Sequence, residues 1–380
     1  MTPASVHLTP GHEAFRSEVR AVLDAHVVPC LAEWERSRCI PRPAWRLLGK
    51  HGLLGVGYAP DRDLFHSLVL LEELGRTGYA GFRAAVGVHA YMATHYLAKS
   101  GSPFLRARYL APAVAGEKIA ALAVTEPDAG SDLAGLAVSA TAAGEHVVLR
   151  GVKSMITNGT TADFFVVAAR TGVGSAGPAG ISLFVVDSAS PGVSVRPQET
   201  VGWHCADTAE VRFSDVRVPT GNMIGRVGTG FRQLMHGFQL ERFVAAALAL
   251  GGIESCLDAT RTHLRTRHVF GGRLSDLQSV RHAMAELFTE LAAARHLVHD
   301  AAWRLSQDDL PAAECSMAKL YTTELACRVA DRCLQLHGAN GYLAGSAVAR
   351  AHAEARAATM AAGPSEVMRD LIAGEMVDLG

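Results

Sequence analysis

A single carboxylate interrupts an apolar helical face in the second half of the chain. Glu241 shares this face with four apolar residues at helical spacing, Leu234, Phe238, Ala245 and Leu248. The positions three and four residues away on either side are uncharged, so the helix offers no cation for a local pair. Burying an unpaired carboxylate is costly unless a site uses it. The pattern predicts a catalytic Glu241; the alternatives are a pair with a distant arginine or a side chain tilted into solvent.

A polar turn follows an apolar strand much earlier in the chain, at residues 124–132. Thr125 and Ser131 provide hydroxyl groups, and the stretch Ala129-Gly130-Ser131 exposes backbone N–H groups. Such groups suit a pyrophosphate or the rim of a flavin ring. An ordinary capped turn has the same composition, so the residues alone leave both interpretations open.

Three zones of the sequence are available to position these residues. From about residue 11 to 115, apolar residues recur at helical spacing and glycines separate the runs, which predicts several helices. From about 119 to 225, short β-branched runs alternate with turn clusters, which predicts a small antiparallel barrel or sandwich. From about 229 onward, long periodic segments rich in Ala and Leu predict helices again.

The composition argues against several classes of protein. The 36 Lys and Arg residues nearly balance the 37 Asp and Glu residues, so no general field would attract nucleic acid. No run of 18 or more apolar residues occurs, so we expect no membrane span. The seven scattered cysteines form no C-x-x-C pair and the 17 histidines no H-x-x-x-H pair, so we expect no metal site and a reducing, cytoplasmic location. No strand is followed by G-x-G-x-x-G and a helix, which disfavours a Rossmann domain.

Several separated segments together resemble the acyl-CoA dehydrogenase family. The turn reads T-E-P-D-A-G-S-D at residues 125–132 and matches every fixed position of that family's T-E-P-x-A-G-S-D signature. Residues 151–163 are similar to its G-x-K-x-W-I-T-N-G…A-D segment, with Met155 in place of the tryptophan. Residues 267–278 and 335–342 resemble two further segments, and the resemblance runs in order from about residue 12 to 376.

This resemblance implies an α+β, mainly α-helical fold in three parts. The parts are an N-terminal helical domain over residues 1–118, a middle antiparallel β domain over 119–225 and a C-terminal four-helix bundle over 226–380. Members of the family usually assemble as homotetramers. The seven scattered cysteines and the lack of a long apolar run are compatible with a location in the cytoplasm.

The resemblance also implies an FAD cofactor and assigns residues to it. Thr125 and Thr157 would bind the flavin ring, Met155 would lie beside it, and Ser131 would bind the pyrophosphate. The remaining cofactor-binding residues would include several that reach the FAD of a neighbouring subunit or lie along its phosphates: Arg267, Phe270, Gln278, Gln335 and Gly338.

A further implication concerns the catalytic base. Removing a proton α to a thioester carbonyl needs a carboxylate in a dry pocket, and hydrogen bonds to the carbonyl stabilise the enolate. In many members the base is the glutamate of a Y-E-G-T string, but here the matching residues read Ala361-Ala362-Gly363-Pro364. Residues 362–367 instead resemble the isovaleryl-CoA dehydrogenase branch, whose base lies in an L-E-R string, as in Leu240-Glu241-Arg242.

Similarity to this branch implies roles for three positions. Glu241 would accept the α-proton, the backbone N–H of Ala362 would bind the thioester oxygen, and Arg242 would lie at the substrate. Glu366 is a second carboxylate in this region, but it matches a position that is not the base in this branch.

We therefore expect an FAD-dependent dehydrogenase, a flavoprotein oxidoreductase acting on a CH–CH bond of a short or branched acyl thioester. The acyl carrier would be CoA or an acyl or peptidyl carrier protein, and an electron-transfer flavoprotein or another acceptor would take the electrons. Two alternatives stay open. One is a flavin-dependent monooxygenase or oxidase of the same fold, which would not need Glu241 as a base. The other is a non-catalytic subunit that completes a partner's FAD site.

Overall fold

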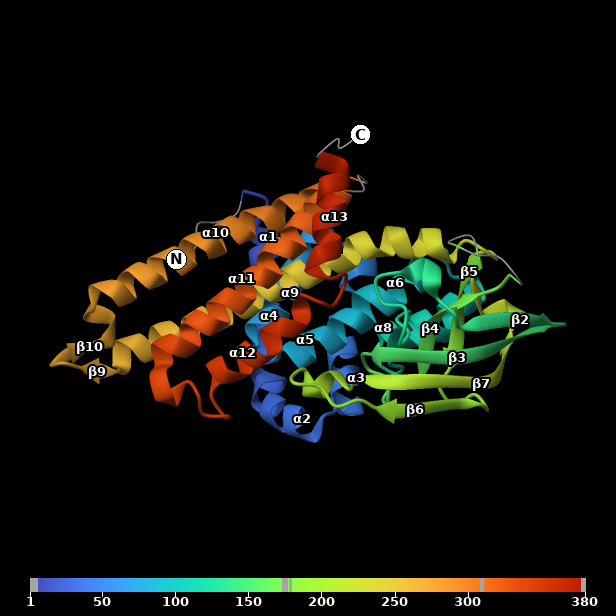
Figure 1. Cartoon of the computed structure of the whole chain (residues 1–380), viewed down its shortest axis with the longest axis horizontal. Coiled ribbons are helices and arrows are strands. Elements are labelled where there is room, and N and C mark those ends of the chain that lie inside the picture. The colour runs from blue at the N-terminus through green and yellow to red at the C-terminus, as the bar shows by residue number, and fades with distance from the viewer. Residues whose placement is uncertain (1–5, 173–176, 178–179, 308–310, 377–380) are drawn as a thin grey trace.

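The computed structural model describes residues 6–172, 177, 180–307 and 311–376, and these form helices, then a sheet, then helices again (Figure 1). A π-helical turn, Val88–Ala93, joins two of the N-terminal helices into one continuous element. The helices of this first part are α1 Pro10–His26, α2 Leu31–Ser37, α3 Arg42–Lys50, α4 Leu64–Arg76, α5 Ala80–Gly87, α6 Thr94–Ser100, α7 Pro103–Leu105 and α8 Ala111–Val114.

An eight-stranded sheet follows, with strand order β6-β7-β3-β2-β4-β5-β8 and β1 paired with β4. The expected antiparallel unit is confirmed, although β1 and β2 both run parallel to β4. A parallel neighbour needs a long connection, and β1 and β4 are separated by the whole β2–β3 hairpin. The strands are β1 Ala120–Ala123, β2 Ser139–Ala143, β3 His146–Ile156, β4 Phe164–Arg170, β5 Ile181–Asp187, β6 Val193–Pro197, β7 Ala209–Pro219 and β8 Met223–Ile224.

Strands β4 and β5 are apolar on both faces because each face borders its own core. Phe164 belongs to an apolar cluster with Tyr96 of α6, between the sheet and the helices. Its neighbour Phe165 points the other way, into a second cluster with Val211 of β7. A strand that is buried on both faces gives a continuous apolar run instead of an alternating one.

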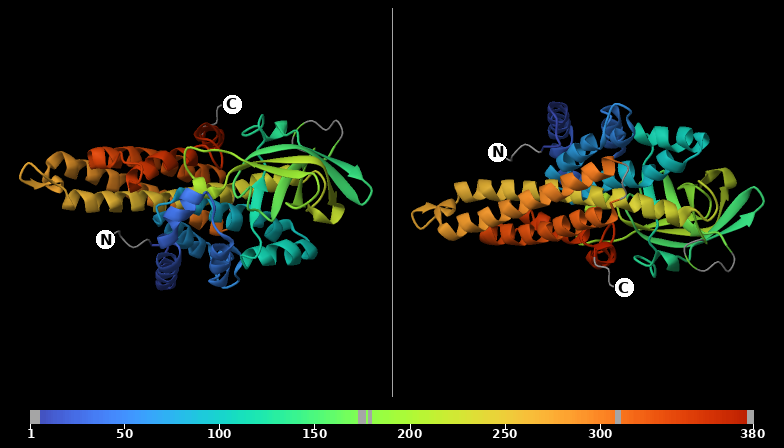
Figure 2. Two further views of the ribbon diagram at one scale, coloured as in Figure 1. Left: turned by 90° about the horizontal axis from the view of Figure 1, so that it is seen from below. Right: turned by 90° about the horizontal axis from the view of Figure 1, so that it is seen from above.

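The C-terminal part is a long helical bundle that extends away from the sheet (Figures 1 and 2). Its longest helix has 37 residues and is about 55 Å long. A two-stranded hairpin lies at the end of the bundle that is remote from the sheet. The elements are α9 Gly230–Thr266, β9 His268–Val269, β10 Gly272–Arg273, α10 Gln278–Ser306, α11 Ala312–His337, α12 Ala347–Ala358 and α13 Ser365–Met376.

Helix α9 is the central element, and it packs against α4 on one side and α11 on another. Its backbone crosses that of α4 at glycines, since a Cβ on Gly75 would lie 2.4 Å from the Leu248 carbonyl oxygen and one on Gly251 2.0 Å from that of Glu72. Of the described helices, α9 alone is long and apolar enough to cross a membrane by length and composition. Because 67% of its most apolar window is buried inside the protein, it has the character of a core helix.

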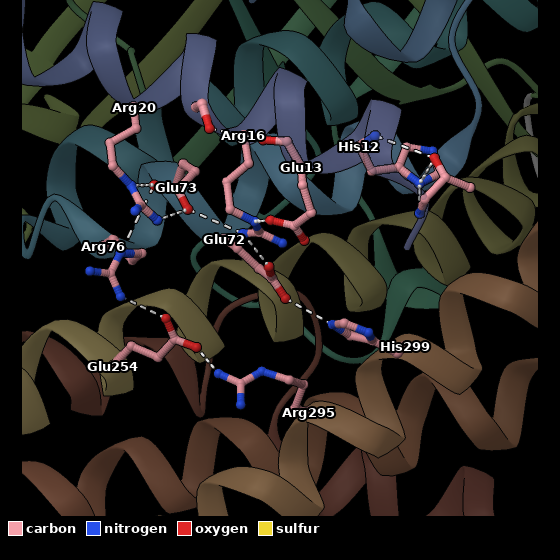
Figure 3. Close-up of polar contacts among 12 residues, drawn as sticks. His12, Glu13, Arg16, Arg20, Glu72, Glu73, Arg76, Glu254, Arg295 and His299 are labelled. Carbon is pink, nitrogen blue, oxygen red and sulfur yellow. Dashed lines mark hydrogen bonds and ion pairs between the residues drawn. The ribbon is translucent and has the colours of Figure 1, made fainter. Parts of the chain in front are cut away.

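A buried charged network connects α1 and α4 to α9 and α10 (Figure 3). Glu72 of α4 accepts from Arg16 of α1 (2.7 Å) and hydrogen bonds His299 of α10 (2.9 Å). The next residue, Glu73, accepts from Arg20 (2.8 Å). The network continues through Arg76 to Glu254 of α9, which also pairs with Arg295 of α10. Each carboxylate of this network therefore has at least one cationic partner.

A second polar cluster at the start of α1 and α4 brings possible ligand atoms of His12, Asp63 and His66 within 4.8 Å of one another. The backbone N–H of Thr9 donates to Nδ1 of His12 (3.0 Å), which places the ring proton on Nε2, 3.1 Å from Asp63. A protonated Nε2 has no lone pair for a metal ion. The side chains instead cap helices, because Thr9 and Asp63 both form capping boxes with the histidine three residues on.

Candidate active site

Glu241 lies in the N-terminal half of α9, and its side chain is buried. The hydroxyl of Tyr96 in α6 donates to its Oε1 (3.1 Å). In the part of the chain that the structure describes, no Lys or Arg nitrogen lies within 4.0 Å of this carboxylate. Burial raises the pKa of the Glu241 carboxyl group to about 7, although the hydrogen bond from Tyr96 and the charge of Arg242 act in the opposite direction. This carboxylate can therefore accept a proton near neutral pH.

Tyr96 is a site residue that the sequence did not reveal. It is 145 positions from Glu241, and only the packing of α6 beside α9 brings the two together. Gly237, one helical turn before Glu241, makes room for the phenol, because a Cβ there would lie 2.4 Å from the Tyr96 hydroxyl oxygen. The sequence did carry one signal for this contact, a glycine one turn before the buried carboxylate. Because glycine weakens a helix interior, its presence there indicates that another group approaches the backbone closely.

Arg242 follows Glu241 and is also buried, with one guanidinium nitrogen donating to Oε1 of Gln239 (3.0 Å). Its Nε is buried and has no hydrogen-bond partner among the described residues. Burial lowers the pKa of Arg242, while the charges of Glu241 and of Glu375 in α13 oppose this effect. An unsatisfied buried donor beside the carboxylate suits an oxygen atom of a bound molecule.

Ala362 lies in the connection between α12 and α13, with φ of 53°. Gly363 follows with φ of 94°, so two consecutive residues have the left-handed conformation. The neighbouring amides form local bonds, from Ala361 to the Ala357 carbonyl and from Ser365 to the Thr359 carbonyl. Within the described ranges, the N–H of Ala362 donates to no other residue. This amide is therefore a free donor, as the expected role at a thioester oxygen requires.

The polar turn after β1 is held by a buried ion pair that sequence reasoning also missed. Lys153 of β3 donates to the Val124 carbonyl and to Oε1 of Glu126, both at 2.7 Å. Glu126 also accepts the backbone N–H groups of Ala137 (2.7 Å) and Val138 (3.0 Å). Burial lowers the pKa of Lys153 to about 8, and the charge of Glu126 opposes this effect. The pair fixes the backbone on which the neighbouring Thr125 stands.

The residues expected at a flavin ring form an open polar rim. The backbone N–H of Ser154 donates to the Thr125 carbonyl (2.9 Å), which joins the turn to the end of β3. The hydroxyls of Thr125 and Thr157 are half-buried, and neither bonds another residue among those the structure describes. Met155 is exposed and has φ of 59°. Ser131 is also exposed, beside Gly130, where a Cβ would meet nothing within 4 Å. The hydroxyls, the free backbone and the open space fit the edge of a flavin and its pyrophosphate.

The other expected cofactor-binding residues lie at the opposite end of the molecule. Glu241 and Arg267 are 26 positions apart along α9, which corresponds to about 39 Å. Phe270, at the tip of the β9–β10 hairpin, is 97% exposed. Figure 1 shows this hairpin and the sheet at opposite ends of the bundle. Arg267, Gln335 and Gly338 line a cavity of about 250 Å³ there, and Gln278 lies exposed at the start of α10. The expected cofactor-binding residues therefore form two groups, one near the sheet and one at the remote end of the bundle.

Comparison with known proteins identifies the class of enzyme. Three family models match the chain in order: the N-terminal domain of acyl-CoA dehydrogenase at residues 9–117, the middle domain at 121–216 and the C-terminal domain at 228–377. The chain belongs to the acyl-CoA dehydrogenase family. It is accordingly a flavoprotein oxidoreductase that uses FAD to oxidise acyl-CoA.

Individual relatives agree with this assignment over nearly the whole chain. The mitochondrial long-chain specific acyl-CoA dehydrogenase of Sus scrofa is 36% identical over 373 residues, which is 96% of this chain and 86% of that protein. The mitochondrial isovaleryl-CoA dehydrogenase of Pongo abelii is 33% identical over 376 residues, covering 96% and 88%. The crystal structure of acyl-CoA dehydrogenase from Geobacillus kaustophilus superposes with a TM-score of 0.95 at 35% identity, covering 98% of this chain and all of that one.

Proposed function

We propose that this protein removes an α-proton and a β-hydride from a short or branched acyl thioester, with Glu241 as the base. The observation that carries the proposal is the buried Glu241 carboxylate, which has a neutral hydroxyl donor and no cationic partner within the described ranges. A base must match its pKa to the working pH, and burial raises the pKa of this group to about 7.

The hydrogen-bond donors around Glu241 suggest the roles of the surrounding residues. Glu241 takes the α-proton while the Tyr96 hydroxyl holds the carboxylate in place. The free N–H of Ala362 and the unsatisfied Nε of Arg242 are donors for the thioester oxygen, where charge develops as the α C–H bond breaks. FAD, when bound, supplies the acceptor for the hydride that leaves the β carbon, and an α,β double bond remains in the product.

We propose further that each FAD is held by two copies of the chain in a homotetramer. Thr125, Ser131, Met155 and Thr157 would contribute from one copy, at the end near Glu241. The group at the remote tip would contribute from a neighbouring copy: Arg267, Phe270, Gln278, Gln335 and Gly338. The separation of about 39 Å along α9 supports this division, because it exceeds what one cofactor at one site can bridge within a single chain.

The size of the acyl group is part of the proposal. Tyr96 is packed over Gly237 directly beside the Glu241 carboxylate, so its ring limits the space next to the proposed base. This arrangement supports a short or branched chain. The named relatives include both a long-chain and an isovaleryl-CoA enzyme. We propose CoA or an acyl or peptidyl carrier protein as the acyl carrier, an electron-transfer flavoprotein as electron acceptor, and the cytoplasm as the location.

Anaerobic bleaching of the flavin tests the proposal. The purified holoenzyme would be mixed with a panel of CoA-linked and carrier-linked acyl thioesters of increasing length and branching. We expect rapid bleaching with short or branched members and a loss of bleaching with long ones. Turnover only with oxygen and a flavin reductase would support a monooxygenase instead. Weak FAD retention, together with unchanged behaviour of Glu241→Gln, would indicate a non-catalytic subunit.

A further inference from the structure

Lys319 of α11 is fully buried, and among the described residues its ammonium group bonds only backbone oxygens of one loop. Its Nζ donates to the carbonyl of Gly363 (2.6 Å) and to that of Thr359 (3.2 Å). These two carbonyls lie on either side of Ala362, in the connection between α12 and α13. No carboxylate oxygen lies within 4.0 Å of Nζ among the described residues, so the ammonium group serves the loop backbone. Burying a lysine is costly unless its donors are used in this way.

The loop needs such a constraint because its backbone is strained. Ala362 has a positive φ of 53°, a conformation in which its Cβ crowds the following carbonyl oxygen. Such residues persist when the surrounding structure over-determines them. Pro364 has no N–H, so it cannot donate a backbone bond to stabilise the turn. The carbonyl of Gly363 has Lys319 as its hydrogen-bond donor, whereas that of Thr359 also accepts the N–H of Ser365.

Lys319 also lies close to the proposed site. Burial lowers its pKa to about 8, and the charge of Arg242 lowers it further, while the charges of Glu324 and Glu366 act in the opposite direction. Lys319 and Arg242 stand on α11 and α9, two helices that pack against each other in the bundle. At pH 7 the amine is mostly protonated and retains three N–H donors.

We propose that Lys319 is a positioning residue that sets the shape of residues 359–363, so that the N–H of Ala362 is directed at the thioester oxygen. The inference rests on the proposed role of Ala362. Lys319 does not touch the substrate; it acts through the loop. A displacement of about 1 Å at a catalytic donor can cost on the order of 100-fold in rate, so loss of the clamp has a measurable effect.

Three variants of the full-length holoenzyme test the inference. Lys319→Met keeps the length and apolar stem but removes every donor, and Lys319→Gln keeps a neutral donor on a shorter stem. Thr323→Val is the matched control, because Thr323 is buried one turn further along α11 and bonds only the Lys319 carbonyl within the described chain (2.8 Å). We expect kcat for flavin reduction to fall about 10- to 100-fold in Lys319→Met, with KM little changed. Lys319→Gln should recover part of this loss, and Thr323→Val should resemble the parent.

Hydrogen exchange of the amides of Ala361, Ala362, Gly363 and Ser365 gives a readout that does not depend on turnover. We expect faster exchange in Lys319→Met than in Thr323→Val, at equal FAD content. Unchanged exchange or unchanged kcat in Lys319→Met would overturn the inference; if this variant does not fold, Lys319→Gln is measured in its place. If none of the tested thioesters bleaches the flavin of the parent enzyme, the proposed function fails. The exchange experiment would still report whether Lys319 holds the loop.

Discussion

Glu72 and Glu241 are buried to a similar depth, with exposures of 4% and 6%, yet the pKa values of their carboxyl groups shift in opposite directions. Burial alone would raise both. At Glu72, the hydrogen bond from His299 and the charge of Arg16 outweigh burial and lower the pKa (Figure 3). At Glu241, burial raises the pKa to about 7, because the Tyr96 hydroxyl and the charge of Arg242 lower the pKa by less than burial raises it.

The difference shows that the partners of a buried carboxylate, and not its depth, separate a structural role from a chemical one. Glu72 is kept ionised by the Arg16 guanidinium group and by the hydrogen bond from His299, and these contacts also join α1, α4 and α10. Because these partners lower its pKa, the Glu72 carboxylate stays ionised near neutral pH. Glu241 has a neutral donor that orients the carboxylate without neutralising it. Four experiments test this difference between the two carboxylates.

The largest effect is expected at Glu241 itself. Glu241→Gln keeps the shape but cannot accept a proton, so the rate of flavin bleaching by an acyl thioester should fall about 10³- to 10⁴-fold. FAD content should stay the same. The matched control is Glu366→Gln, which removes the second carboxylate of this region and should bleach at nearly the parent rate. A large loss of bleaching rate in Glu366→Gln together with a small loss in Glu241→Gln would mean that Glu366 is the base.

The second effect concerns stability at the paired carboxylate. Glu72→Ala leaves Arg16 and His299 without this partner, and it should cost about 3 to 5 kcal/mol of unfolding free energy. Denaturant midpoints at one protein concentration measure this cost. The bleaching rate per bound FAD should not change. Glu290→Ala removes one side of a surface pair with Arg328 and should cost less than about 1 kcal/mol.

The third effect is the pH dependence of stability at Glu241. The folded-state pKa of about 7 lies above the ordinary value of 4.5 for a glutamate, so the buried carboxylate destabilises the fold increasingly as pH rises through this interval. The glutamine variant has no such charge. Between pH 5 and pH 9, the stability difference should therefore move in favour of Glu241→Gln by about 3 kcal/mol. A constant stability difference across this pH range would mean that the pKa of the Glu241 carboxyl group is not raised.

The smallest effect is expected from Tyr96→Phe. Removing the hydroxyl removes a hydrogen bond that favours the charged carboxylate, so the pKa of Glu241 should rise by about one unit. Because activity needs the ionised base, kcat/KM rises with pH, and the rising limb should move to higher pH in the variant. Tyr58→Phe is the control: this half-buried tyrosine donates to the Ala90 carbonyl (2.9 Å), and its loss should leave the rising limb in place.

Local patterns along the sequence were sufficient for the order of helices and strands and for the inward face of Glu241. Both predictions depend only on the spacing of apolar residues within one element, because the burial pattern repeats along that element. Tyr96, Lys153 and Lys319 could not be predicted, because their partners come from elements far away in the chain. The parallel pairing of β1 with β4 was missed for the same reason, since local patterns do not specify strand neighbours.

The length of α9 has a genetic consequence under the proposed sharing of FAD. A chain that lacks the base and a chain that lacks the remote arginine are each inactive alone, because each damages one half of every site. When both are made together, some sites in a mixed tetramer would combine the intact halves of two different copies. Co-expression of Glu241→Gln with Arg267→Ala should therefore restore a fraction of activity. A helix about 55 Å long would in this way allow two defective alleles to complement each other.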